Sequence, residues 1–244
     1  MRKTWLVISI LLAAGLVAAW LGTPFLRVPA ALAATAAAGT HRTYKTTFPL
    51  TESPISERGN WINGKSVGLD WADVATTSGR AYGLESGSNG YDDSVALLTG
   101  GWGPDQTVQA TVYTANQNDT ISEEVELRLR SSLSAHSAMG YEINFRCSKT
   151  KDAYSEIVRW NGPLGGFTYL QQLKGAQFGV ADGDVVKATI VGNVITTYIN
   201  GVQVGRATDG SYATGQPGIG FFLKGPSGVN RDYGFTRFMA SDKR

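Results

Sequence analysis

The segment from Glu124 to Arg130 has the residue types and spacing best suited to chemistry in this chain, because its charged residues alternate with aliphatic ones. Successive side chains of a β-strand point to opposite faces. The charged residues of the segment, which would share one face, are Glu124, Glu126, Arg128 and Arg130. Carboxylates and guanidinium groups on a rigid sheet can bind sugar hydroxyls, and arginine can bind a uronate carboxylate through two parallel hydrogen bonds. The spacing therefore predicts a glycan-binding surface.

A second predicted strand, Gly140–Cys147, extends this surface. Its residues on the polar side are Glu142, Asn144 and Arg146, and Tyr141, Ile143 and Phe145 lie on the other side. If the two strands are antiparallel neighbours, two registers keep the polar faces together, with Glu142 opposite either Arg128 or Arg130. The sequence leaves the register open. A ligand-free surface of cross-strand salt bridges is the alternative interpretation, since exposed ion pairs contribute little stability.

Trp160 is the aromatic candidate for the same surface. It lies beside the turn Asn161-Gly162-Pro163, and an indole next to a sugar-binding sheet can stack on the apolar face of a pyranose. Trp160 alternates with Arg159, so only one of these two side chains can join the polar face. The predicted ligand-binding residues are Glu126, Arg128, Arg130, Glu142, Asn144, Arg146 and Trp160.

Glu124 and Glu126 could also form a catalytic pair. Residues two apart on a strand are roughly 6.5–7 Å apart along the backbone, and inverting glycosidases hold their carboxyl groups about 6.5–9.5 Å apart. However, we expect Arg128 and Arg130 to keep both glutamates ionised, whereas a general acid must hold its proton near neutral pH. The sequence therefore favours binding without catalysis.

Short runs of β-forming residues, separated by turn residues and many of the 30 glycines, cover the chain beyond the N-terminal region. Asn200-Gly201 joins two such runs, and both residues tolerate the positive φ of a type I′ turn, which places Ile199 opposite Val202 and Thr197 opposite Val204. No amphipathic helical pattern of useful length occurs, so two antiparallel sheets packed face to face are predicted. The candidate strands are Ser94–Leu98, Thr107–Thr114, Glu124–Ser131, Gly140–Cys147, Ser155–Trp160, Phe167–Leu173, Val185–Val191, Val194–Asn200, Gly201–Arg206, Gly218–Leu223 and Tyr233–Ala240.

The N-terminal region has the features of a targeting segment. A basic start, Met1-Arg2-Lys3, precedes an apolar run from Trp5 to Leu21 and the small-residue site Ala31-Leu32-Ala33. The sequence predicts a signal peptide over residues 1–33, a linker over 34–45 and a single domain over 46–244. An uncleaved anchor is the alternative, because the apolar run is marginal for spanning a bilayer. In either case we expect the folded part outside the cytoplasm, secreted or in the periplasm or cell envelope.

Composition excludes some partners and cofactors. Arg2, Lys3 and Arg27 lie in the predicted signal peptide, so the rest of the chain has 19 of the 22 basic residues and 20 acidic ones. The chain has no cluster of lysine and arginine residues of the kind that binds nucleic acid. No membrane contact beyond the signal segment is predicted, no cofactor is required, and the oligomeric state is not indicated. Asp92-Asp93, or Asp182 and Asp184, could supply oxygen ligands for a structural Ca²⁺, although no spacing identifies one site. The single cysteine, Cys147, is expected to be a buried apolar side chain.

Several motifs together resemble one known superfamily. TTYINGVQV is followed by Gly215-Gln216-Pro217-Gly218-Ile219-Gly220-Phe221, and VELRLRSS, GYEINFRC and YSEIVRW precede them. These motifs and the final Tyr233–Phe238 resemble concanavalin A-like lectin/glucanase domains, also described as laminin-G-like, from about Phe48 to the end. The resemblance implies a jelly-roll β-sandwich. This chain differs from the glucanases of the superfamily, because Arg128 and Arg130 occupy the later positions of their acidic strand motif.

The resemblance and the polar face together predict a secreted, lectin-like module that binds extracellular or cell-envelope polysaccharide without catalysis. A polysaccharide lyase or glycoside hydrolase of the same fold is one alternative. Lyases of this fold would draw on a tyrosine with a glutamine or histidine, for which Tyr141, Gln171 and Gln172 are candidates. A structural or adhesive envelope module is the other alternative. A deep, polar, aromatic-lined groove would favour a glycan ligand, and a flat salt-bridged sheet would favour the structural module.

Overall fold

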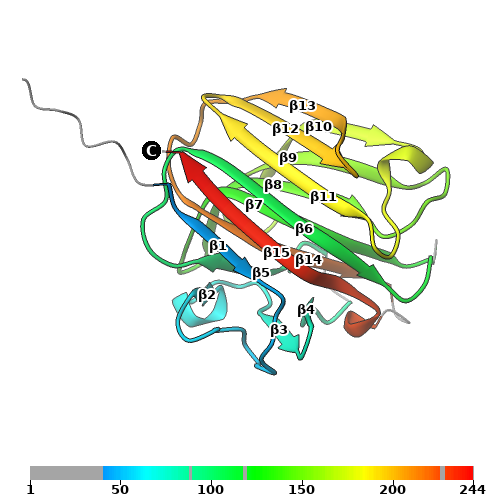
Figure 1. Cartoon of the computed structure of the whole chain (residues 1–244), viewed down its shortest axis with the longest axis horizontal. Coiled ribbons are helices and arrows are strands. Elements are labelled where there is room, and N and C mark those ends of the chain that lie inside the picture. Colours follow the sequence, from blue (N-terminus) through cyan, green and yellow to red (C-terminus); the bar gives the residue numbers. More distant parts are fainter. Residues whose placement is uncertain (1–40, 88–89, 118–119, 226–228, 244) are drawn as a thin grey trace, which may run out of the picture. The chain divides into compact units, whose positions relative to one another are not determined.

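The described residues form strands β1 to β15, which build two antiparallel sheets packed face to face (Figure 1). The structure is a computed structural model that describes residues 41–87, 90–117, 120–225 and 229–243. The predicted signal peptide and most of the predicted linker lie outside these residues. In the described part of the chain, no helix is long and apolar enough to cross a membrane.

One sheet, here called sheet A, has the strand order β13–β12–β11–β6–β15–β4–β3, with β1 also paired to β15. Its strands are β1 (Thr43–Thr46), β3 (Val74–Thr77), β4 (Arg80–Gly83), β6 (Asp105–Thr114), β11 (Val185–Val191), β12 (Val194–Ile199), β13 (Val202–Thr208) and β15 (Tyr233–Lys243). The other sheet, sheet B, has the order β10–β9–β8–β7–β14–β5–β2. Its strands are β2 (Trp61–Asn63), β5 (Ser94–Leu98), β7 (Ser122–Ser134), β8 (Ser137–Arg146), β9 (Tyr154–Gly162), β10 (Phe167–Lys174) and β14 (Gln216–Lys224).

The predicted all-β sandwich is confirmed, and each candidate strand from β5 onward is present. The sequence does not predict β1 to β4, which have three or four residues each. Such short runs do not show an alternation of apolar and polar residues. β1 begins at Thr43, inside the range predicted as linker, because it pairs with β15. Three short 3₁₀ helices complete the described elements, at Lys65–Val67, Ala176–Phe178 and Asn230–Asp232.

The β12–β13 hairpin turns at Asn200 and Gly201, whose φ angles are 51° and 80° as the predicted turn requires. Ile199 lies opposite Val202 as expected. Thr197, however, lies opposite Gly205 instead of Val204, because a bulge shifts the register. A Cβ at position 205 would come within 2.6 Å of Thr197 Oγ1, so a glycine is required for this close approach.

The apolar side chains of β7 and β8 fill the space between the sheets. Val125, Leu127 and Leu129 of β7 and Tyr141, Ile143 and Phe145 of β8 are each 0% exposed. They pack in one cluster with residues of sheet A such as Val108 and Ile195. Cys147 joins the same cluster, as expected. Because these side chains alternate with the charged ones, their burial directs the charged residues to the other face of sheet B.

Leu127→Ala should test this anchoring. We expect the free energy of unfolding in urea to fall by about 2–5 kcal/mol, because the substitution leaves a cavity at a fully buried site. Leu164→Ala, the same substitution at a turn residue that is 40% exposed, is the control and should change it by less than about 0.5 kcal/mol. Equal effects of the two substitutions would contradict the placement of Leu127 in the core.

Candidate functional site

The strands at the centre of sheet B bring most of the predicted polar residues together. β7 and β8 pair with Arg128 opposite Glu142 and Glu124 opposite Arg146, which is one of the two registers allowed by the sequence. β9 continues this face, and its Trp160 donates a hydrogen bond from Nε1 to Oε2 of Glu142. Of the two neighbours Arg159 and Trp160, Trp160 is therefore the one whose side chain lies on the polar side.

A cavity of about 310 Å³ opens on this face and is lined by Glu124, Glu126, Glu142, Asn144 and Trp160. The expectation of an open polar surface is wrong for the innermost residues of the face. Glu126, Arg128 and Glu142 are only 1%, 2% and 3% exposed. Neighbouring side chains from β9, β10 and β14 and from the residues before β5 form the walls around them. The polar lining includes Asp93, Glu124, Glu126, Glu142, Asn144 and Glu156, and the aromatic lining is Tyr91, Tyr154, Trp160, Phe167, Tyr169 and Phe222.

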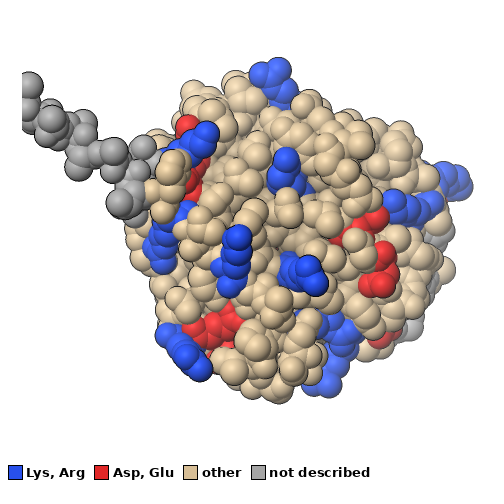
Figure 2. All heavy atoms as spheres, viewed as in Figure 1, with Lys and Arg blue, Asp and Glu red and all other residues tan. Residues whose placement is uncertain are grey.

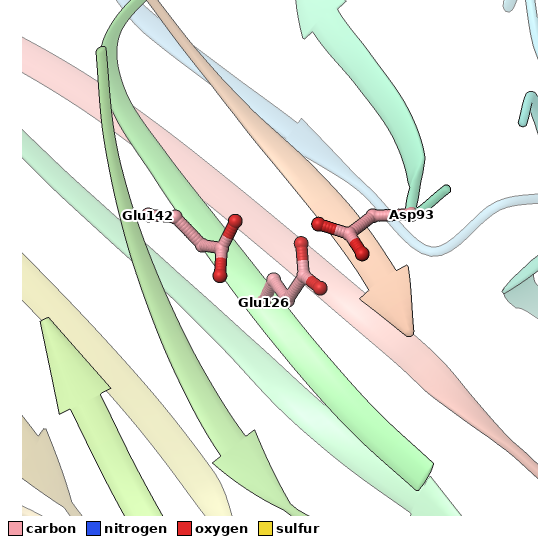
Figure 3. A group of neighbouring side chains, drawn as sticks. All are labelled: Asp93, Glu126 and Glu142. Atoms are coloured by element: carbon pink, nitrogen blue, oxygen red, sulfur yellow. The ribbon is translucent and has the colours of Figure 1, made fainter. Parts of the chain in front are cut away.

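Arg128 pairs with three carboxylates at the inner end of the cavity. Its Nη1 lies 2.8 Å from Oε2 of Glu142, and its Nη2 lies 2.5 Å from Oε2 of Glu126 and 3.4 Å from Oδ2 of Asp93. Figure 3 shows these three carboxyl groups pointing toward one another from β8, β7 and the residue before β5. Buried charges are tolerated when they are paired. The guanidinium therefore makes this concentration of acidic groups compatible with folding.

The same three carboxylates have the spacing of a cation site, since one oxygen from each lies within 4.8 Å of the others. The Arg128 guanidinium already supplies positive charge to all three. The other aspartates considered from the sequence contact protein groups. Asp92 accepts a hydrogen bond from Ser86 Oγ at 3.4 Å, Asp182 accepts one from Thr114 N, and Asp184 pairs with Lys149 at 2.9 Å. A structural Ca²⁺ stays a prediction.

A second group of polar contacts lines the cavity toward β10. Tyr154 donates a hydrogen bond to Oε1 of Glu124. Asn144 Nδ2 donates to Glu156 at 3.2 Å and to Glu142 at 3.3 Å, and Gln172 Nε2 donates to Glu156 at 2.7 Å. Tyr154 and Glu156 are not among the residues predicted from the sequence. Glu156 alternates with Ser155 and Ile157 on the candidate strand Ser155–Trp160, which was a usable signal, whereas Tyr154 lies one residue before that range.

Burial dominates the protonation of the acidic groups. It raises the pKa of Glu124 to about 8, and the hydrogen bond from Tyr154 and the charge of nearby Arg146 lower this pKa only in part. Burial, together with the charge of Glu142, also raises the pKa of Glu126 and of Asp93 well above the usual range. The expectation that neighbouring arginines keep Glu124 and Glu126 ionised is therefore wrong, because the cost of burying a carboxylate outweighs the attraction.

Aromatic rings form one wall of the cavity. Trp160 contacts Phe167 with ring centroids 5.1 Å apart, and Phe167 contacts Tyr91 at 5.0 Å and Tyr169 at 5.1 Å. Tyr91 and Tyr169 are 48% and 44% exposed, so the cavity opens at the surface beside them. Trp160 itself is 3% exposed and packs on Trp71, so it supports the wall instead of presenting a free stacking surface.

Two of the predicted ligand-binding residues, Arg130 and Arg146, contact other groups than expected. Arg130 has a φ of 44° at a bulge in β7, and its guanidinium donates to the carbonyl oxygens of Pro104, Tyr212 and Gly192 at 2.6–3.0 Å. The structure thus separates Arg130 from the cavity, because the extra residue of the bulge reverses the alternation. Arg146 stays on the polar face, where its Nη2 donates to the Ile121 carbonyl at 2.9 Å.

The residues suggested for a lyase do not come together. Tyr141 lies on the core side of β8, where its hydroxyl donates to Oδ1 of Asp209 at 2.7 Å, and Arg128 lies on the opposite side. Gln171 accepts a hydrogen bond from Arg206 N, whereas Gln172 binds Glu156 on the cavity side. His136, in the turn after β7, is 77% exposed and binds Asp70.

The outer face of sheet A presents a different kind of surface. Figure 2 shows separate lysine and arginine side chains over the middle of this face, with acidic side chains beside others toward its edges. A hollow of about 640 Å³ lies here, with Lys45, Gln109 and Arg237 among its lining residues. Its aromatic lining residue, Phe238, is buried. The cavity of sheet B, which combines exposed rings with buried polar groups, is therefore the candidate site.

Comparison with solved structures identifies the fold. β-Agarase B in complex with agaro-octaose matches with a TM-score of 0.53 and 10% identity, over 85% of this chain and 96% of that one. The κ-carrageenase of Pseudoalteromonas carrageenovora, in complex with an oligotetrasaccharide of κ-carrageenan, matches with a TM-score of 0.50 and 12% identity, over 87% and 100%. Neither a protein-family model nor a curated protein sequence matches this chain. The chain has the jelly-roll fold of the concanavalin A-like lectin/glucanase superfamily.

Stability should fall with rising pH because of Glu124. Its carboxyl binds a proton more tightly in the folded state, where its pKa is about 8, than in the unfolded chain, where it is about 4.5. Between these values the unfolded state has lost the proton and the folded state keeps it, so the free energy of unfolding decreases by up to about 1.4 kcal/mol per pH unit. Urea unfolding from pH 5 to 8 should show a shallower decrease in Glu124→Gln. Parallel curves for the two proteins would contradict the raised pKa.

Arg128→Met should destabilise the protein by about 3–5 kcal/mol, because it leaves buried carboxylates without their cation. Arg206→Met, which changes an exposed arginine of β13, should cost less than about 0.5 kcal/mol in the same urea unfolding experiment. The double variant Arg128→Met/Glu142→Gln should recover part of the loss by removing one uncompensated carboxylate. If Arg128→Met left the free energy of unfolding unchanged, the ion-pair network would be contradicted.

Proposed function

We propose that this protein binds glycan chains in the cavity of sheet B and does not cleave them. The observation that carries the proposal is the combination of buried polar groups with an aromatic wall in one cavity of about 310 Å³. Sugars present hydroxyl groups at their edges and apolar C–H groups on their faces. Acceptors such as Glu142 and Glu156 fit the edges, and the exposed rings of Tyr91 and Tyr169 fit the faces.

Oligosaccharides are the class of ligand present in the compared β-agarase and κ-carrageenase structures. A flat sheet of salt bridges, which would favour a purely structural or adhesive module, is not what lines this cavity. The predicted targeting segment adds a location to the proposal, because a secreted or envelope-bound module would meet polysaccharides outside the cytoplasm.

Hydrolysis is the second candidate function, and one observation favours it. Glu124 has a pKa of about 8, so it keeps its proton at neutral pH as a general acid must, and Glu126 lies two residues away on the same face. Against it, Arg128 binds both Glu126 and Glu142 and occupies the position where an acidic residue would continue the glucanase motif. A search for new reducing ends after incubation with bound polysaccharides separates the two functions. Their appearance, and their loss in Glu124→Gln, would replace binding with hydrolysis.

Tyr169→Ala should weaken glycan binding by about tenfold, which corresponds to about 1.4 kcal/mol, because it removes the exposed ring at the cavity entrance. A glycan array with the purified protein would identify ligands, and titration calorimetry would then compare the variants. The matched control is Tyr198→Ala, which removes a tyrosine paired with Lys187 on sheet A and should leave affinity unchanged. Absence of binding to any neutral, acidic or basic glycan would refute the proposed function.

A further inference from the structure

The charge balance of the cavity indicates which glycans fit it. Its five carboxylates are Asp93, Glu124, Glu126, Glu142 and Glu156. Arg128 pairs with three of them. Among the residues that the structure describes, no lysine or arginine lies within ion-pair distance of Glu124 or Glu156. Burial raises the pKa of both Glu124 and Glu156, so these carboxyls hold protons where the protein supplies no paired cation, and a cationic ligand could replace those protons.

The positive groups nearby are not arranged to receive an anion. Arg128 is 2% exposed and is surrounded by its three carboxylates. Arg146 donates to the Ile121 carbonyl, and its guanidinium lies 5.6 Å from the centre of the Tyr154 ring. Lys224, at the end of β14, is exposed and offers a single ammonium. A carboxylate or sulfate of an acidic polysaccharide would lie among five acidic groups here, and each of them that is ionised would repel it.

Two buried acceptors in the cavity have no hydrogen-bond donor among the residues that the structure describes. They are Oε1 of Glu126 and Oδ1 of Asn144, on residues that are 1% and 5% exposed. A buried acceptor without a partner costs about 1–3 kcal/mol, so a ligand that brings donors is favoured. An ammonium group brings three donors, no acceptor and a positive charge. It therefore satisfies both the hydrogen bonding and the charge of this cavity.

The aromatic wall distinguishes an ammonium on a sugar from a metal ion. Tyr91 and Tyr169 offer apolar ring faces that a bare cation does not need but that a pyranose can cover. A divalent cation among Asp93, Glu126 and Glu142 would in addition have to compete with the guanidinium of Arg128. An amino sugar uses the rings and the carboxylates together.

We propose that the glycan of this cavity contains amino sugars with free ammonium groups, and that the cavity selects them over neutral and acidic sugars. This inference rests on the proposed function and specifies its ligand. The ammonium would lie among Glu124, Asn144 and Glu156, and the sugar face would lie against Tyr169. A neighbouring positive charge would favour the ionised form of Glu124, whose pKa is otherwise about 8.

The test compares β-1,4-linked hexasaccharides of glucosamine, N-acetylglucosamine and glucose, which differ at one ring substituent, together with a galacturonate hexasaccharide. Calorimetric titration of the purified protein near pH 7, closer to the pKa of Glu124, should give an affinity for the glucosamine hexamer at least about tenfold above that for the neutral hexamers. The galacturonate hexamer should not bind. Added salt should weaken the glucosamine complex more than any neutral complex, because it screens the charge interaction.

Glu156→Gln removes one carboxylate at the half-buried edge of the cavity and should lower the preference for glucosamine over glucose several-fold. Asp152→Asn, which neutralises an acidic residue outside the cavity, should leave this ratio unchanged. Tighter binding of neutral or acidic glycans than of the glucosamine hexamer would overturn the inference and leave the proposed function intact. If no glycan binds in this titration or on the array, the proposed function and the inference both fail.

Discussion

The pairing of Arg128 with Asp93, Glu126 and Glu142 is the interaction on which the candidate site depends. Several carboxylates can share one buried region only if a cation offsets their repulsion and their loss of hydration. Because the guanidinium is planar and has several donors, it can bind three acidic groups at once from below the cavity. The network fixes the inner end of the site before any ligand arrives.

The same two strands build both the core and the site. Leu127 of β7 is buried between the sheets, and its neighbours Glu126, which lines the cavity, and Arg128, which pairs with Glu126, lie on the other face of the strand. Any shift of β7 that disturbed the core would therefore displace the charged groups as well. This shared backbone gives the cavity a rigid base, while the wall built by β10 and by the residues before β5 contributes the exposed rings of Tyr169 and Tyr91.

Burial gives the cavity a chemistry that its residue types alone do not suggest. Exposed glutamates beside arginines would be ionised, whereas here the pKa of Glu124 rises to about 8. Protonated carboxyl groups can donate as well as accept hydrogen bonds, which suits the mixed donors and acceptors of a sugar. The arginines, in contrast, bind carboxylate and carbonyl groups of the protein itself, so they do not provide the uronate-binding groups that the sequence suggests.

The sequence by itself determined the sandwich and the side of the strand on which the residues from Glu124 to Leu129 of β7 and from Tyr141 to Arg146 of β8 lie, because alternation is a local property of the backbone. It placed Arg128 with Glu142 as one of two registers, and it correctly grouped Glu126, Asn144 and Trp160 with them. Only the tertiary structure decided that this face is a cavity instead of an open surface. Segments distant in sequence, carrying Tyr91, Asp93 and Tyr169, cover it, and the bulge at Arg130 removes one residue from it. Depth and walls depend on such distant contacts, which no local pattern encodes.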